Sequence, residues 1–155
     1  MLKKFVPALA CALAAITFVP VAATATISAA GVAEGTYESQ VLTYTNKYRA
    51  SHDLKALAVR SCVDSYAEKQ ARKMRDAHKL YHQSMTTIMS ACNLRMVGEN
   101  IAYGYTSGHL VVNAWMNSPG HRANILKSGY RLLGVGAVKD SHGVWWVSQV
   151  FGTAR

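Results

Sequence analysis

The sequence predicts an α+β protein, a three-layer α-β-α sandwich with a central, mainly antiparallel sheet. Several segments between residues 36 and 126 repeat apolar residues every three or four positions, as amphipathic helices do. The runs 132–138 and 144–151 have the composition of strands. In 144–151 both alternating faces are apolar, whereas a strand with one wet face alternates apolar and polar residues. Helices are therefore expected on both sides of the sheet.

Two long helices are predicted in the first half of the chain. The first runs from Thr36, its expected N-cap, to about Ala50, and its inward stripe is rich in tyrosine. The second runs from about Ser61 to Leu80. Its basic residues over 69–75 are expected to form a solvated face.

Shorter elements follow. Helical turns are expected over 85–91 and 107–117, and a fresh helix over 118–126, with Ser118 as N-cap and a proline at the first helical position, where its missing N–H costs nothing. A third strand is expected around 99–103.

The strand region closes the chain. The residues between the two last strands, Lys-Asp-Ser-His-Gly, have the chemistry of a hairpin turn. Gly134 and Gly136 lie inside a strand and indicate close packing of a neighbouring element. Neither an internal repeat nor a long linker is visible, so one domain over residues 36–153 is expected.

The N-terminal segment has the three-part layout of a secretory signal peptide. Lys3 and Lys4 precede an apolar run, and a tract of small residues follows. Cleavage is expected after Ala25, with an alternative as late as Ala33. A membrane anchor is disfavoured because the run is shorter than the about 20 strongly apolar residues of a spanning helix.

Export would change the charge only slightly. Of 17 basic residues two are lost, which leaves 15 against 8 acidic residues, a net charge of +7. We expect a secreted or envelope-associated monomer that meets an anionic cell-envelope surface. Nucleic acid is not expected as a partner, because no aromatic platform with interleaved basic residues is visible.

The mature chain keeps two cysteines, Cys62 and Cys92. Exported proteins meet an oxidising environment, and two cysteines allow one intramolecular pairing. A disulfide between them is expected. Closing a loop of 30 residues stabilises the fold by about 3.7 kcal/mol in the chain-entropy model.

Signatures of nucleotide-binding, serine-hydrolase and zinc-protease sites are absent from the sequence. The remaining candidates are histidines and one acid. Glu99 begins a predicted buried strand, where a carboxylate needs a hydrogen-bonding or charged partner, and a structural role is as compatible with this position as a functional one. His121 lies in the first turn of the predicted helix 118–126, where the helix dipole favours a neutral imidazole.

Several motifs follow one another in a characteristic order. They are Thr45-Asn-Lys-Tyr-Arg49, His82, Gly98-Glu-Asn-Ile-Ala102, Trp115-Met-Asn-Ser-Pro-Gly-His-Arg-Ala-Asn-Ile-Leu126, Gly134-Val-Gly136 and Trp146-Val-Ser-Gln-Val-Phe151. In this order they resemble the CAP superfamily of cysteine-rich secretory proteins, venom antigens and plant pathogenesis-related proteins, in its short bacterial single-domain form. The resemblance spans about Tyr37 to Gly152.

The resemblance implies an α-β-α sandwich and a cleft in which two histidines and acidic residues can hold zinc or another divalent cation. Carried over by motif, His82, Glu99 and His121 are the expected metal ligands. A further glutamate found in many eukaryotic members is absent here, because Met-Asn-Ser follows Trp115. Supporting hydrogen bonds are expected from four residues of the matching motifs, Asn100, Ser118, Arg122 and Asn124.

The resemblance does not determine an activity. The favoured hypothesis is a secreted binding module whose cleft takes a divalent metal, a small ligand, a lipid or a peptide without turnover, because no serine or cysteine nucleophile paired with a base stands out. The alternative is a metal-dependent hydrolase or peptidase. There His82 and His121 would hold the cation, and Glu99 would be the catalytic general base on a bound water.

Overall fold

The computed structural model describes residues 33–155, and the predicted signal peptide over residues 1–25 lies outside the described residues. The elements are, in chain order, α1 (Glu34–Ala50), β1 (Ala58–Val59), α2 (Ser61–Ala77), α3 (Met85–Ala91), β2 (Leu94–Tyr103), α4 (Gly108–Met116), α5 (Pro119–Ile125), β3 (Leu132–Lys139) and β4 (Trp145–Ala154).

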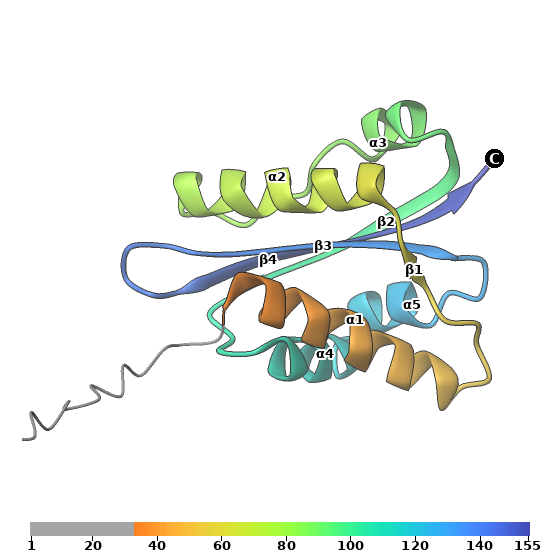
Figure 1. The fold of residues 1–155 in the computed structure, drawn as a ribbon, viewed down its shortest axis with the longest axis horizontal. Coiled ribbons are helices and arrows are strands. Elements are labelled where there is room, and N and C mark those ends of the chain that lie inside the picture. The colour runs from red at the N-terminus through yellow and green to blue at the C-terminus, as the bar shows by residue number, and fades with distance from the viewer. Residues whose placement is uncertain (1–32) are drawn as a thin grey trace, which may run out of the picture.

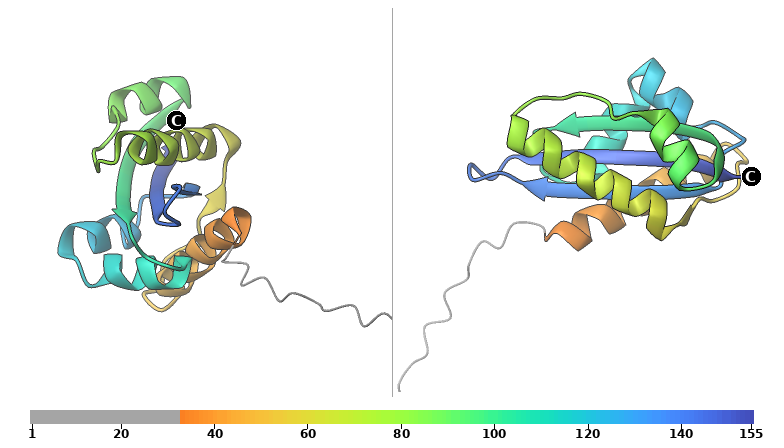
Figure 2. Two further views of the ribbon diagram at one scale, coloured as in Figure 1. Left: turned by 90° about the vertical axis from the view of Figure 1, so that its left-hand side faces the viewer. Right: turned by 90° about the horizontal axis from the view of Figure 1, so that it is seen from above.

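The predicted three-layer architecture is confirmed. The four strands lie in the order β1-β3-β4-β2, with β4 antiparallel to both its neighbours and the short β1 parallel to β3. Helices α2 and α3 cover one face of the sheet, and α1, α4 and α5 cover the other (Figure 1). Figure 2 shows the same layering from the end and from above.

The two apolar faces of β4 bury into different clusters. Trp145, Val147 and Phe151 belong to the cluster beneath α1 and α4. Trp146 packs with Ala71 and Met74 of α2. The prediction from the sequence that both faces of this strand are apolar and buried is therefore confirmed.

Some predicted element ends differ from the observed ones. Helix α1 begins at Glu34, with Ala33 at the N-cap position and no side-chain cap, so Thr36 is already helical. Helix α2 ends at Ala77 and not at Leu80, because His78 adopts a left-handed conformation with φ of 45°. The short strand β1 was not predicted, because two residues carry no periodicity and only pairing with β3 defines them.

Close packing explains Gly134 and Gly136, as predicted. A Cβ atom at Gly134 would overlap backbone atoms of Val63 and Asp64, and one at Gly136 would overlap backbone atoms of Ala67 and Glu68. Helix α2 therefore lies directly on the backbone of β3, and neither position has room for a side chain.

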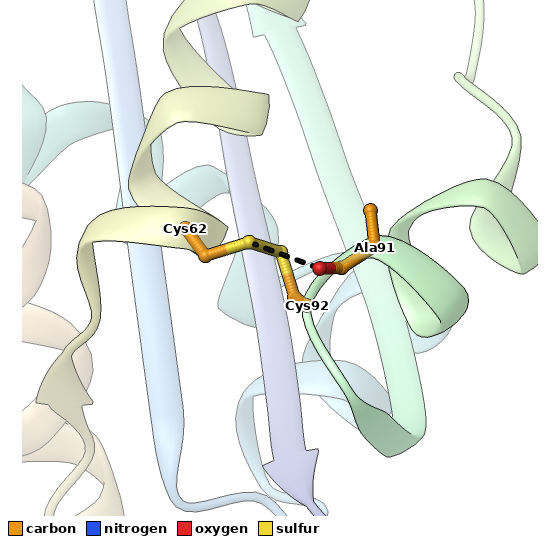
Figure 3. Close-up of a disulfide and its surroundings, with 3 residues drawn as sticks. All are labelled: Cys62, Ala91 and Cys92. Carbon is orange, nitrogen blue, oxygen red and sulfur yellow. Dashed lines mark hydrogen bonds between the residues drawn. A yellow bond between two sulfur atoms is a disulfide. The ribbon is translucent and has the colours of Figure 1, made fainter.

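The predicted disulfide is present. Cys62 and Cys92 are bonded, with 5.7 Å between their Cα atoms (Figure 3). The bond joins the first turn of α2 to the end of α3. It holds α3 beside α2, in a small cluster with Ile88 and Leu94.

One arginine of α1 connects this helix to the end of α5 and to the segment that follows α5. The side chain of Arg49 is fully buried. Its guanidinium donates to the carbonyls of Lys55 (2.9 Å), Ile125 (2.8 Å), Lys127 (3.0 Å) and Tyr130 (3.3 Å). Carbonyls at the end of a short helix lack helical partners, and a buried charge needs several of them to replace water.

Carboxylates cover part of the outer edge of β3, which pairs with β1 only at its start. Asp64 accepts from the N–H of Val135 at 3.0 Å, and Glu38 accepts from the N–H of Ala137 at 3.1 Å. The pKa of Glu38 is raised to about 7, mainly by burial; the backbone hydrogen bond from Ala137 opposes this rise, and the nearby acidic residues Asp64, Glu68 and Glu34 contribute to it. Side chains thus protect an exposed strand edge, at an electrostatic cost.

Replacing Gly136 by Ala should destabilise the protein by about 1–3 kcal/mol, because the added methyl group must displace the backbone of α2. Urea unfolding measures the change. Gly35→Ala in α1 is the matched control, since nothing lies within 4 Å of the new methyl and alanine favours a helix; it should stabilise slightly. Equal effects of the two substitutions would contradict this packing.

Replacing Glu38 by Gln should flatten the dependence of stability on pH. The folded pKa lies above the unfolded one, so between about pH 4.5 and 7 the native state binds the extra proton and stability falls as pH rises. Glutamine keeps the acceptor for Ala137 without the charge. In urea unfolding from pH 4.5 to 8, the free energy of unfolding of Glu38→Gln should rise relative to that of the wild type between about pH 4.5 and 7. The exposed Glu34→Gln is the control and should show a much smaller rise.

Candidate functional site

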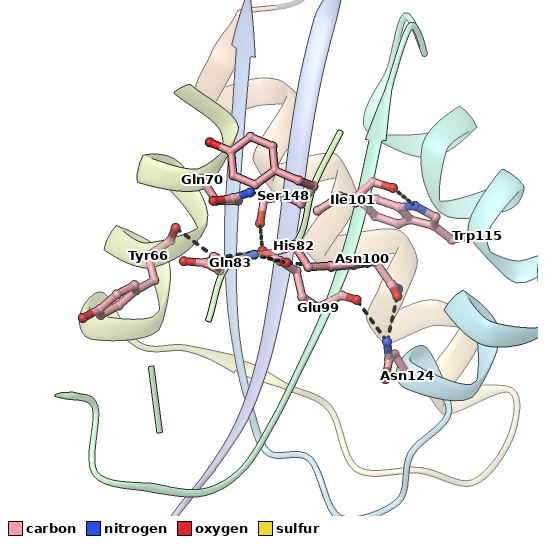
Figure 4. A network of polar contacts seen from close by, with 11 residues as sticks. Tyr66, Gln70, His82, Gln83, Glu99, Asn100, Ile101, Trp115, Asn124 and Ser148 are labelled. Carbon is pink, nitrogen blue, oxygen red and sulfur yellow. Dashed lines mark hydrogen bonds and ion pairs between the residues drawn. The ribbon is translucent and has the colours of Figure 1, made fainter. Parts of the chain in front are cut away.

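Glu99 lies in the middle of β2 with its side chain buried, and four donors surround its carboxylate (Figure 4). Oε2 accepts from Nδ1 of His82 at 2.8 Å and from the backbone N–H of Gln83 at 3.4 Å. Oε1 accepts from Nε2 of Gln83 at 2.7 Å and from Oγ of Ser148 at 2.9 Å. The expectation that this buried carboxylate has hydrogen-bonding partners is met, and one of them is a histidine.

The carboxylate orients the imidazole of His82. An ionised carboxylate only accepts hydrogen bonds, so Nδ1 of His82 carries the proton in this contact. Nε2 is then the free ring nitrogen of a neutral imidazole. More than half of the side chain of His82 is exposed, in contrast to Glu99. The nitrogen of His82 that does not contact Glu99, Nε2, is therefore the one left to accept a hydrogen bond.

His121 lies on α5, and its Nδ1 is 2.9 Å from Oγ of Ser118. Ser118 occupies the predicted N-cap position, but its side chain makes no cap hydrogen bond and contacts the imidazole instead. Burial lowers the pKa of His121, and the nearby His82 lowers it further. The lowered pKa of His121 agrees with the predicted neutral imidazole, although the main cause of the lowering is burial and not the helix terminus.

A buried chain of amides sets α5 against the sheet. Asn100 donates to the side-chain oxygen of Gln149 at 3.1 Å and to the backbone oxygen of His121 at 3.2 Å. Asn124 donates to Oδ1 of Asn100 at 3.0 Å and to the backbone oxygen of Glu99 at 3.1 Å. Gln149 donates in turn to Oγ1 of Thr45 at 2.7 Å. Both asparagines therefore connect α5 to the sheet by hydrogen bonds.

Arg122 lies outside this arrangement. Its side chain is exposed, and among residues 33–155 it makes no hydrogen bond to the histidines or to Glu99. Gln83 and Ser148, which donate directly to Glu99, were not predicted from the sequence as site residues. Gln83 adjoins His82, and Ser148 lies in the closing motif, so their places beside candidate site residues were visible in the sequence but their partners were not.

A cavity of about 260 Å³ adjoins His121 between β2, α4 and α5. Its wall is mainly apolar and aromatic. The lining residues are Leu80, Ile101, Ala102, Tyr103, Tyr105, Ala114, Trp115, Ser118 and His121. Leu80, Tyr103 and Tyr105 are large apolar side chains that remain exposed to solvent, and the sequence analysis did not assign them to the site.

One buried polar atom near His82 has no protein partner. Among residues 33–155, Oε1 of Gln70 is the buried side-chain atom without a hydrogen bond. The other end of the same amide donates to the backbone oxygen of Tyr81, directly before His82. A buried acceptor of this kind is normally satisfied by water or by a bound hydroxyl.

The three expected metal ligands do not form a metal centre here. His82 and Glu99 are in contact, and His121 contacts Ser118. Both oxygens of Glu99 already accept from protein donors. Within residues 33–155 no group of three or more His, Cys, Asp or Glu is arranged to hold a cation. Protein zinc sites use three or four such ligands, so these residues do not fit one.

The fold is that of an α-β-α sandwich domain, and comparison with known proteins identifies its family. The family model described as cysteine-rich secretory protein family, CAP, matches residues 42–151. The chain belongs to this family. It is 35% identical over 136 residues to the uncharacterized protein YkwD of Bacillus subtilis (strain 168), a match that covers 83% of this chain and 52% of YkwD.

Solved structures share the fold. An extracellular protein containing an SCP domain from Bacillus anthracis str. Ames superposes with a TM-score of 0.68 at 29% identity, over 77% of this chain and 41% of that protein. NaASP2 with Zn²⁺ superposes with a TM-score of 0.59 at 15% identity, over 83% and 84% of the two chains. The chain thus spans about half the length of YkwD and less than half of the Bacillus anthracis protein. Within residues 33–155 no helix is long and apolar enough to cross a membrane.

The geometry of the histidines predicts that zinc is bound weakly. Calorimetric titration of the mature protein with zinc should give no tighter binding than a His82→Ala, His121→Ala double variant, because no third side chain among residues 33–155 is placed to complete the site. Glu99→Ala, titrated in the same way, should bind zinc as the wild type does, because Glu99 in this geometry is not expected to be a zinc ligand. Stoichiometric binding that either substitution abolishes would contradict the prediction.

Proposed function

We propose that the protein is secreted and acts as a binding module that takes an amphipathic small ligand, lipid or peptide into the cleft beside His82 and His121, without turnover. The extracellular description of the Bacillus anthracis protein supports the location. The observation that carries the binding proposal is an apolar cavity with the imidazole of His121 at its polar side, close to His82.

The cavity favours the apolar part of such a ligand. Ile101, Tyr103 and Trp115 offer it a largely apolar wall, and Ser118 and His121 offer it a polar end. Ligand sites are commonly apolar concavities with a few placed polar groups. The volume of about 260 Å³ is below the range of drug-sized ligands, so it accommodates part of a chain or one peptide side chain.

The environment of Glu99 favours binding over hydrolysis. A general base must reach the proton that it abstracts. The oxygens of Glu99 accept from His82, Gln83 and Ser148, and its side chain is buried. We assign Glu99 the role of orienting His82. The metal-dependent hydrolase would need a set of ligands that the residues present do not supply, and no catalytic step is derived for it.

Filling the cavity should weaken binding of an amphipathic probe. Dodecanoate can place its chain against Trp115 and its carboxylate near the imidazoles, so titration should change tryptophan fluorescence saturably. Ala114→Phe fills the cavity and should weaken binding about tenfold or more, because the apolar contact is lost.

Ala123→Phe, on the exposed face of α5, is the matched control and should bind as the wild type does. Circular dichroism and thermal unfolding verify that both variants fold. Undiminished binding by Ala114→Phe, or no saturable binding of dodecanoate by the wild type, would contradict the proposal.

A further inference from the structure

A second cavity, of about 240 Å³, lies between α1 and α4, and none of its lining residues lines the cleft. Its lining residues are Tyr44, Lys47, Tyr48, Ser51, His109 and Asn113. From the sequence, the tyrosines of α1 were expected to be core and His109 was assigned no role. Tyr44, Tyr48, His109 and Asn113 are in fact only partly buried, and they share this cavity.

A hydrogen-bonded chain fixes the imidazole in this cavity. The hydroxyl of Tyr48 donates to Oδ1 of Asn113 at 2.8 Å. Nδ2 of Asn113 is 2.9 Å from Nε2 of His109. An amide nitrogen only donates, so Nε2 of the neutral ring accepts and the proton of the ring is on Nδ1. Among the hydrogen bonds of residues 33–155 that involve His109, none uses Nδ1, so this N–H is a free donor with a set orientation.

Charge and aromatic surface accompany this donor. The ring of Tyr44 stacks on His109, with 4.1 Å between the ring centroids. The ammonium of Lys47 lies 5.8 Å from the centroid of Tyr44. No lining residue is acidic, and among the ion pairs of residues 33–155 none involves Lys47. The cavity therefore offers a positive charge, an N–H donor and aromatic faces.

A purely structural role leaves part of this arrangement unexplained. Besides the hydrogen bond from the N–H of Gly108 to Oε1 of Gln40, the hydrogen bond from Tyr48 to Asn113 joins α1 to α4. It requires neither an oriented His109 nor an uncompensated ammonium at the same cavity. Oriented donors beside a cation are the usual means of binding an oxyanion, and a ring can pack on aromatic faces.

We infer that the cavity between α1 and α4 binds an oxyanion, a carboxylate or phosphate, carried on a single sugar-like ring of a larger molecule. Lys47 and Nδ1–H of His109 would hold the oxyanion, and Tyr44 and Tyr48 would flank the ring. The small volume admits one ring, and the remainder extends into solvent. The excess of basic residues favours an anionic polymer as the source. This site is independent of the proposed cleft function.

Three probes test the inference, namely glucuronate, glucose 6-phosphate and uncharged glucose. Binding is followed by NMR of the ring resonances of His109 and Tyr44 in the mature protein. Saturable shifts with either anion, and none with glucose at the same concentrations, are expected. Tighter binding of glucose 6-phosphate supports a phosphate-bearing unit, and tighter binding of glucuronate supports a carboxylate-bearing one. No saturable shift with both anions, or equal shifts with glucose, would overturn the inference.

Two variants locate the site. Lys47→Met keeps the aliphatic stem, and His109→Phe keeps the stack on Tyr44 but removes the donor; each should weaken binding of the anions about tenfold or more. Lys127→Met is the matched control, because Lys127 lies over Tyr130 in a similar way at 5.9 Å, and it should bind as the wild type does. Thermal unfolding verifies the fold of each variant. Wild-type affinity in both Lys47→Met and His109→Phe would overturn the inference.

Discussion

The cleft depends on the hydrogen bonds made by the buried side chain of Asn100. It joins β2 to β4 through Gln149 and to α5 through Asn124 and the backbone of His121. Arg49 holds the far end of the same short helix by its terminal carbonyls. A helix of seven residues has little stability of its own, so these polar anchors, and not helix propensity, determine where α5 lies.

The polar interior has the organisation expected of a satisfied network. Glu99 is buried among apolar elements, and the four donors that replace water come from the segment after α2 and from β4. Removing one partner would leave a buried charge or amide uncompensated, which is more costly than the contact itself is favourable. The same network that stabilises the sheet therefore also gives His82 one tautomer and one orientation.

Different residues of helix α4 line the two cavities. Ala114 and Trp115 line the cleft, and His109 and Asn113, one helical period apart, line the cavity against α1. The motif Thr45-Asn-Lys-Tyr-Arg49 divides in a similar way. Thr45 and Arg49 face inward to anchor the fold, and Lys47 and Tyr48 face the second cavity. A family motif thus contains residues with separable structural and surface roles.

The sequence by itself determined the layers, the disulfide and the close packing at Gly134 and Gly136, because these follow from local periodicity, from the pairing of two cysteines and from the missing side chain of glycine. It also identified His82, Glu99 and His121 by motif. Only the tertiary structure decided that Glu99 orients His82, that Ser118 contacts His121 and that His109 shares a cavity with Lys47. These partners are brought together by the packing of separate elements, and the pattern along one segment does not specify which atoms of another segment it will meet.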